Sequence, residues 1–182
     1  LICRPFRKVA MNLKLFFLLI SLLSICESSK ILIVHTSMSR SHVIPLQEFA
    51  KVLAKRGHDI TFVSSFPLEK TINNYRDIEV KISQNDLKFF DDFSKTMGQD
   101  PSSISFLQLM SAISKILYGH GNFTLQSNEV HNLLNSGEQY DLVITGYFMS
   151  EYLLGIADHF KCPSIVFFSG GYLSSIHKMI GN

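Results

Sequence analysis

Cysteine is scarce in this 182-residue sequence, which contains only Cys3, Cys26 and Cys162. The first two lie in an N-terminal stretch that we predict is removed, so one cysteine would stay in the mature chain. A single cysteine cannot form a disulfide within the chain. The fold must therefore rest on its apolar core, and a mature chain of about 150 residues is long enough to bury one.

Glycine is absent from the chain before Gly57. A dinucleotide-binding unit needs a Gly-x-Gly-x-x-Gly turn after its first strand, because only glycine lets the backbone approach the pyrophosphate. Here the corresponding turn, residues 36–42, reads Thr-Ser-Met-Ser-Arg-Ser-His. This composition argues against an NAD or FAD oxidoreductase. It offers hydroxyls and an imidazole, which suit a small polar reacting group.

Clusters of lysine and arginine with interleaved aromatic residues are also missing. The chain has 17 Lys+Arg and 15 Asp+Glu, but Arg4, Arg7, Lys8, Lys14 and Glu27 all precede residue 28. The rest of the chain is therefore close to neutral, and we expect no nucleic-acid partner. The histidines lie at no recognisable ligand spacing, so we expect no metal site.

Residues 11–28 have the pattern of a secretory signal peptide. A short basic start from Met11 is followed by the uncharged apolar run 15–25 and then by small and polar residues. The run is shorter than the roughly 20 residues that span a bilayer, although an uncleaved signal anchor is the alternative. We interpret residues 1–10 as read-through from upstream. A lumenal chain also makes Asn122, in its Asn-Phe-Thr sequon, a glycosylation candidate.

Apolar runs rich in β-formers alternate with segments of helical periodicity, a pattern typical of a doubly wound parallel α/β sheet. We predict strands at 30–35, 59–64, 78–82, 140–145 and 163–168. We predict helices at 43–56, 86–97, 103–118, 122–134 and 149–160. Pro45 is expected in the first turn of its helix, where a missing N–H costs nothing.

His42 is the main catalytic candidate, because it lies where the turn after the first strand becomes a helix. In parallel α/β sheets, ligands bind at the carboxyl ends of the strands. Imidazole has an ordinary pKa near 6.5, so its neutral form can accept a proton at physiological pH. The alternative is a surface histidine at a helix start. His35, inside the strand, is predicted to be a buried, hydrogen-bonded core residue.

A histidine base works best with a carboxylate oriented behind it. Glu151 is the nearest acid after the predicted strand 140–145, whereas Asp141 lies at the opposite end of that strand. The alternative for Glu151 is a solvated residue at a helix start. The apolar segment 103–118 similarly leaves two interpretations, core packing or the wall of a pocket for a lipophilic ligand.

Several of these segments, in this order, resemble the N-terminal half of the UDP-glycosyltransferases, in particular the UDP-glucuronosyltransferase-like group of animals. They are a signal peptide running into Lys-Ile-Leu-Ile-Val, the Ser41-His42 turn, the block 53–64 and the stretch 140–171. The resemblance implies that residues 29–182 form the Rossmann-like acceptor-binding domain of a GT-B glycosyltransferase. A C-terminal domain would bind the UDP-sugar, and a membrane anchor would follow it.

The resemblance also implies an activity. His42 would deprotonate a hydroxyl of a small lipophilic acceptor, which would displace UDP from UDP-glucose or UDP-glucuronic acid with inversion. Glu151 would support the histidine, and Ser41, Tyr147 and Phe148 would contact the acceptor. No tightly bound cofactor is implied. The full-length protein would act in detoxification at the endoplasmic reticulum membrane, facing the lumen, alone or as a homo- or hetero-oligomer.

The sequence departs from the family pattern in two ways. The family commonly has an acid just after the strand that here ends in Thr145-Gly146-Tyr147, so either Glu151 substitutes for it or the pair is incomplete. The donor half is also missing, so we expect the 182-residue chain alone to be inactive. A non-catalytic relative that binds hydrophobic ligands or pairs with intact subunits is the alternative, and a transcript extending into a donor domain would argue against it.

Overall fold

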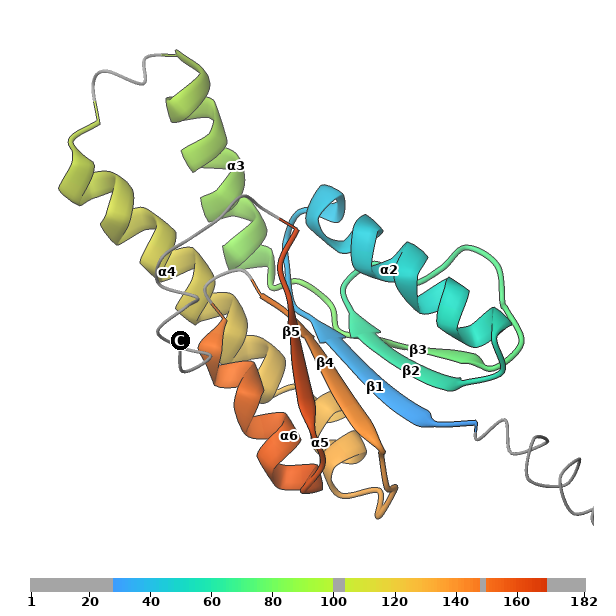
Figure 1. The fold of residues 1–182 in the computed structure, drawn as a ribbon. Helices are drawn as coiled ribbons and strands as arrows, with labels where there is room; N and C mark the ends of the chain where they lie inside the picture. Colours follow the sequence, from blue (N-terminus) through green and yellow to red (C-terminus); the bar gives the residue numbers. More distant parts are fainter. Residues whose placement is uncertain (1–27, 100–103, 148–149, 170–182) are drawn as a thin grey trace, which may run out of the picture.

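The computed structural model describes residues 28–99, 104–147 and 150–169, which form a five-stranded sheet flanked by helices (Figure 1). All neighbouring strands are parallel, in the order β3-β2-β1-β4-β5. The strands are β1 (Lys30–His35), β2 (Asp59–Ser64), β3 (Tyr75–Glu79), β4 (Leu142–Gly146) and β5 (Ser164–Phe167). The predicted Rossmann-like doubly wound sheet is thereby confirmed.

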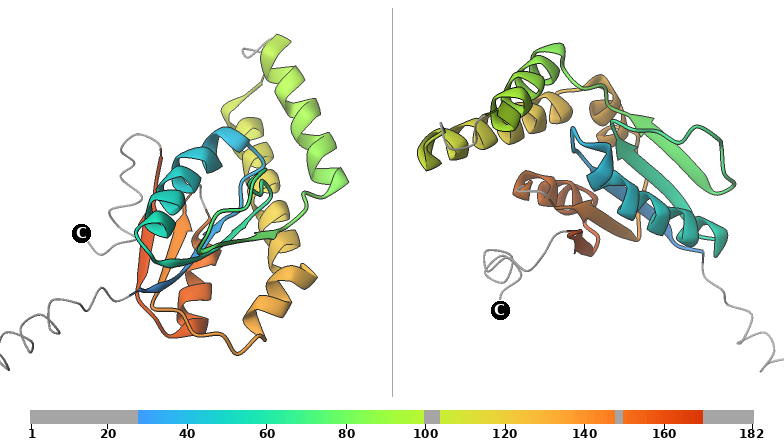
Figure 2. Two further views of the ribbon diagram at one scale, coloured as in Figure 1. Left: turned by 90° about the vertical axis from the view of Figure 1, so that its right-hand side faces the viewer. Right: turned by 90° about the horizontal axis from the view of Figure 1, so that it is seen from above.

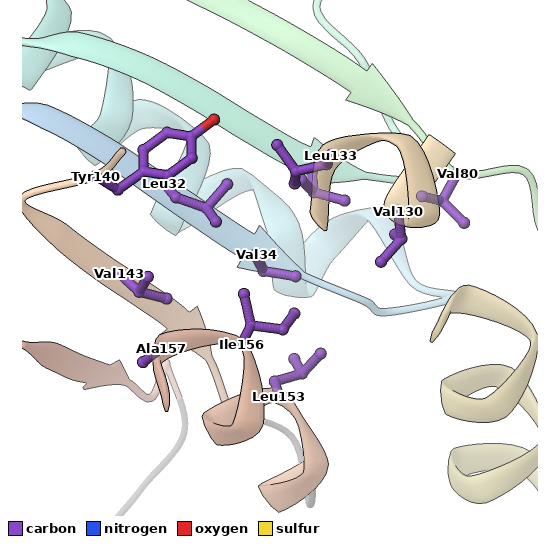
Figure 3. Packing of buried hydrophobic residues seen from close by; sticks show 11 residues of the cluster. Leu32, Val34, Val80, Val130, Leu133, Tyr140, Val143, Leu153, Ile156 and Ala157 are labelled. Atoms are coloured by element: carbon purple, nitrogen blue, oxygen red, sulfur yellow. The ribbon is translucent and has the colours of Figure 1, made fainter. Parts of the chain in front are cut away.

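Helices cover both faces of the sheet, which is why the central strands are apolar on both sides. Helix α2 (Arg40–Lys55) packs on one face, where Val43, Leu46 and Ala50 meet Ile33 and Phe62. The other face is covered by α5 (Asn128–Leu134), the 3₁₀ turn η2 (Glu151–Leu153) and α6 (Leu154–Phe160). Figure 3 shows this second cluster, in which α6 and α5 side chains converge on β1.

The remaining helices, α3 (Gln84–Gln99) and α4 (Phe106–Leu125), lie side by side and extend beyond the sheet (Figures 1 and 2). Helix α4 begins at a capping box in which the Ser105 hydroxyl accepts from the Gln108 backbone N–H and the Gln108 side chain accepts from the Ser105 N–H. Such a box fixes a helix start. In the described residues, no helix combines the length and apolar character that a bilayer span requires.

Part of the surface beside α2 is apolar. Phe49 on α2 is 44% exposed and stacks on Phe167 of β5, with ring centroids 6.4 Å apart. Val52 on α2 and Ile165 on β5 are also about half exposed. These four residues form what we call the α2–β5 apolar surface. Apolar surface of this kind on one side of a sheet promotes contact with other apolar groups in water.

Several predicted boundaries are wrong. Helix α2 begins at Arg40, so Pro45 is its sixth residue and lies inside the helix instead of in its first turn. Strand β3 spans 75–79 and not 78–82, pairing Tyr75 with Ile60 and Glu79 with Ser64. Helix α4 runs on to Leu125, past the end predicted at residue 118, and α5 begins at Asn128 and not at 122.

Candidate active site

The order in which strands are added to the sheet reverses between β1 and β4. From β1 the chain proceeds outward to β2 and β3, and it later returns to place β4 on the other side of β1. The segments that leave β1 and β4 therefore diverge at the carboxyl ends of these two strands. In open α/β sheets this place, called the topological switch point, is where ligands bind. The residues after β1, Thr36 to Ser39, lie at this position.

A pocket of about 160 Å³ opens at the switch point. It is lined by the turn 36–39, His42, Phe90 of α3, Ile116 and His120 of α4, and Tyr152 of η2. A cavity of about 150 Å³ suffices to hold benzene, so this space matches one six-membered ring. Segments distant in sequence thus enclose a ring-sized volume with His42 on its wall.

His42 is the third residue of α2 and is half-buried. Its backbone N–H donates to the Ser39 carbonyl at 3.2 Å, and its Nδ1 lies 3.4 Å from the Ser37 hydroxyl oxygen. The Ser37 hydroxyl also accepts from the Ser39 N–H at 3.1 Å, which fixes it in the turn. The structure therefore places His42 on the wall of the pocket.

His35 supports His42 from the sheet. It is 3% exposed, and its Nε2–H donates to the His42 carbonyl at 3.0 Å. Burial lowers the pKa of His35 to about 4, so the ring is neutral at physiological pH. Its Nδ1 has no partner among the described residues. The prediction of a buried, hydrogen-bonded core histidine is confirmed, and this residue ties the first turn of α2 to β1.

Tyr152 connects the switch point to α4. Its hydroxyl lies 3.0 Å from the Thr36 hydroxyl at the end of β1. Its ring packs directly against Gly121, where an added Cβ would lie 2.6 Å from Oη and also overlap the ring. Gly121 thus gives Tyr152 the space to reach Thr36, and the contact closes one side of the pocket.

We therefore predict that Gly121→Ala distorts the pocket, because the new methyl group and the Tyr152 ring cannot occupy the same space. Overpacking of this kind costs about 1–3 kcal/mol of stability, and we expect ligand binding to the pocket to weaken along with it. The measurement is chemical denaturation together with ligand titration. Gly119→Ala is the matched control, because a Cβ there would meet only Asp86, at an ordinary 3.5 Å. Equal effects of the two substitutions would contradict this assignment.

The other predicted site residues are placed as follows. Ser41 is exposed in the first turn of α2, with its hydroxyl 2.8 Å from that of Ser39, and it does not line the pocket. Tyr147 is buried after β4 and packs edge-on against Phe168. Glu151 begins η2, but its side chain lies outside the described part, as does Phe148.

His120 lines the pocket from α4 and is buried, and the sequence does not predict this role. Its spacing from the other histidines matches no metal site, so the pattern gives it no function. The available signal was its position four residues after the pocket residue Ile116, on the same face of an apolar helix. Nearby Asn122 is exposed, with its side-chain oxygen accepting from Gln126. Within the described ranges, no three His, Cys, Asp or Glu side chains group together as metal ligands.

The parallel sheet with helices on both faces is a Rossmann-like α/β domain. The crystal structure of CalG4, the calicheamicin glycosyltransferase, has a similar fold, with a TM-score of 0.55 and 20% identity. The match covers 86% of this chain and 38% of that chain. No protein-family model matches the sequence.

Curated proteins add a sequence relationship. The chain is 30% identical over 155 residues to UDP-glycosyltransferase UGT5 of Dactylopius coccus and 28% identical over 159 residues to UDP-glycosyltransferase UGT4 of the same species. These matches cover 82% and 84% of this chain. The chain belongs to the UDP-glycosyltransferase family. It spans 28% and 29% of the length of these two relatives and matches their N-terminal portion.

Proposed function

We propose that this chain is the acceptor-binding part of an inverting UDP-glycosyltransferase. The transferase would move a hexosyl or glucuronosyl group from a UDP-sugar to a hydroxyl of a small lipophilic acceptor. The observation that carries the proposal is the position of His42 on the wall of a ring-sized pocket at the switch point. Met38, Phe90 and Ile116 supply apolar lining for the body of the acceptor.

The proposed reaction is a direct displacement. The His42 imidazole accepts the proton of the acceptor hydroxyl, and the oxygen forms a bond to the anomeric carbon of the sugar. The bond between this carbon and the UDP oxygen breaks at the same time, so the electron pair leaves with UDP and the configuration inverts. General-base catalysis of this kind contributes about 10²–10⁴-fold to a rate. Glu151 is proposed to stabilise the imidazolium that forms.

The UDP-sugar is proposed to bind the part of the protein that this chain does not span. The matched portion is less than a third of the two curated relatives, and the pocket is suited to a ring and not to a nucleotide. Residues 11–28 are proposed to direct the protein to the endoplasmic reticulum lumen, with a later segment as membrane anchor. The exposed side chain of Asn122 supports its proposed glycosylation.

The test is a transfer assay with the protein extended to the length of its relatives. UDP-glucose and UDP-glucuronic acid would each be incubated with a panel of small phenols and alcohols. We expect product with one of these donors, and a β-linkage by proton NMR, since both donors are α-linked. The 182-residue chain is expected to bind the same acceptors without forming product. A retained α-linkage, or no product with any pair, would contradict the proposal.

A further inference from the structure

His120 has unsatisfied hydrogen-bonding capacity on the wall of the pocket. Its side chain is 3% exposed, and neither Nδ1 nor Nε2 has a hydrogen-bond partner among the described residues. Most buried polar side chains in folded proteins are paired, because an unpaired group has lost its water without replacement. Both ring nitrogens of His120 therefore lack what a bound molecule would supply.

The ionisation state of His120 defines what such a molecule must offer. Burial lowers the pKa of His120, and the Asp86 carboxylate on the neighbouring α3 opposes this effect only in part. The ring is consequently neutral at physiological pH, with one N–H donor and one bare nitrogen acceptor. A hydroxyl complements either nitrogen, because it both donates and accepts. A carboxylate would satisfy only the donor.

The surroundings of His120 make a ring-shaped partner the best fit. His42 of α2 lines the same pocket, and Phe90 and Ile116 contribute apolar contacts to it. The volume of about 160 Å³ holds one ring with small substituents. One turn further along α4, the buried Thr124 hydroxyl is also without a partner, so polar groups outnumber their partners along this face of the helix.

We propose that His120 is a specificity-determining residue that binds a second polar group on the acceptor ring, distinct from the hydroxyl at His42. The preferred acceptor is then a lipophilic molecule ending in a ring with two hydroxyls, of which one reacts and the other bonds to His120. This inference rests on the proposed function, because it takes the pocket to be the acceptor site. In this proposal, a residue on α4 selects among acceptors by hydrogen bonding.

The test is calorimetric titration of the 182-residue chain with matched ring compounds. Hydroquinone and resorcinol carry a second hydroxyl, whereas 4-methylphenol and 3-methylphenol replace that hydroxyl with a methyl group of similar size. The wild-type chain is expected to bind the better dihydroxy compound about tenfold more tightly than its methyl counterpart, the difference made by about one buried hydrogen bond. His120→Leu is expected to remove this preference, and His120→Gln to retain part of it.

The midpoint of thermal unfolding separates this role from a purely structural one, because loss of a structural histidine would lower the midpoint. His120→Leu removes an unpaired buried polar group and leaves an apolar side chain, so the midpoint is expected to rise by about 2–4 °C. His131→Leu, on the exposed surface of α5, is the control and should change neither binding preference nor midpoint. A folded variant with lower stability and an intact preference would overturn the inference.

The inference and the proposed function fail in different ways. Equal affinity of the wild-type chain for dihydroxy and methyl compounds overturns the role of His120. A preference in His120→Leu equal to that of the wild-type chain also overturns it. Neither result bears on the proposed role of His42. A preference for the dihydroxy compound that the wild-type chain shows and His120→Leu lacks supports the role of His120. This holds even if transfer by the longer protein does not need His42. No binding of any ring compound to the wild-type chain overturns both.

Discussion

Replacement of His42 with alanine is expected to lower kcat of the proposed full-length transferase by about 10²–10⁴-fold, because the acceptor hydroxyl would lose its proposed general base. The acceptor should still bind, since the apolar lining from Met38, Phe90 and Ile116 is unchanged. The measurement is steady-state kinetics with the best donor and acceptor found in the transfer assay, together with the acceptor dissociation constant. A large fall in kcat with a nearly constant dissociation constant identifies the base.

Two comparisons make this result specific to His42. His131→Ala removes an exposed imidazole on α5, remote from the pocket, and is expected to leave kcat unchanged. His42→Gln keeps a polar side chain of similar length without a basic nitrogen, and it should be nearly as inactive as the alanine variant. If His42→Ala retained kcat within a factor of about three, far below the effect of a general base, another group would have to accept the proton.

Substitution of Gly146 with alanine is expected to destabilise the fold by about 3 kcal/mol, at the upper end of the cost of overpacking. An added Cβ would lie 2.5 Å from Nδ1 and 2.8 Å from Cβ of His35, and closer still to Cγ. His35 cannot move away easily, because it is enclosed in the core and bonded to the His42 carbonyl. Urea denaturation of the 182-residue chain measures the change.

A double-mutant cycle shows whether the collision is the cause. With His35→Ala in the background, Gly146→Ala should cost much less, because the ring that it meets is gone. Gly155→Ala is the control, since nothing lies within 4 Å of a Cβ there and alanine favours the helix α6 by about 0.5–1 kcal/mol. Additive effects at positions 35 and 146 would show that the clash is relieved in some other way.

The order of strands and helices could be predicted because each buried strand carries a strong local signal. Strand β1 is almost wholly buried and β2 is buried after its first residue, and both were predicted with their observed bounds. Strand β3 was displaced by three residues because it is an edge strand with mixed exposure. Its position is set by the Tyr75 ring, which stacks on Phe62 with centroids 6.0 Å apart, a contact invisible to local periodicity.

The errors in the helices also come from tertiary contacts. A helix was predicted to end at residue 118, yet α4 continues through Gly121, whose missing side chain leaves room for the Tyr152 ring. Pro45 indicated a helix start, yet α2 begins five residues earlier. A proline there cannot donate to the Ser41 carbonyl, four residues before it. The next carbonyl, that of His42, accepts from His35 across the core, and this contact holds the first turn of α2 against the sheet.

The sequence could predict the position of His42, because ligands bind at the carboxyl ends of parallel strands and His42 follows the first of them. Its catalytic role stays a prediction. His120 could not be found in this way, because its importance comes from the absence of partners around a buried ring, and burial is a property of the folded chain. The relation of Glu151 to His42 stays a prediction.

The α2–β5 apolar surface has a practical consequence for every measurement above. Phe49 and Ile165 are about half exposed, and burying them between two copies would release ordered water, so we expect some self-association at high protein concentration. Titrations and melting curves therefore belong at the lowest workable protein concentration, with light scattering recorded alongside. A charged replacement such as Ile165→Lys is expected to reduce this association, and it lies on β5, outside the pocket lining.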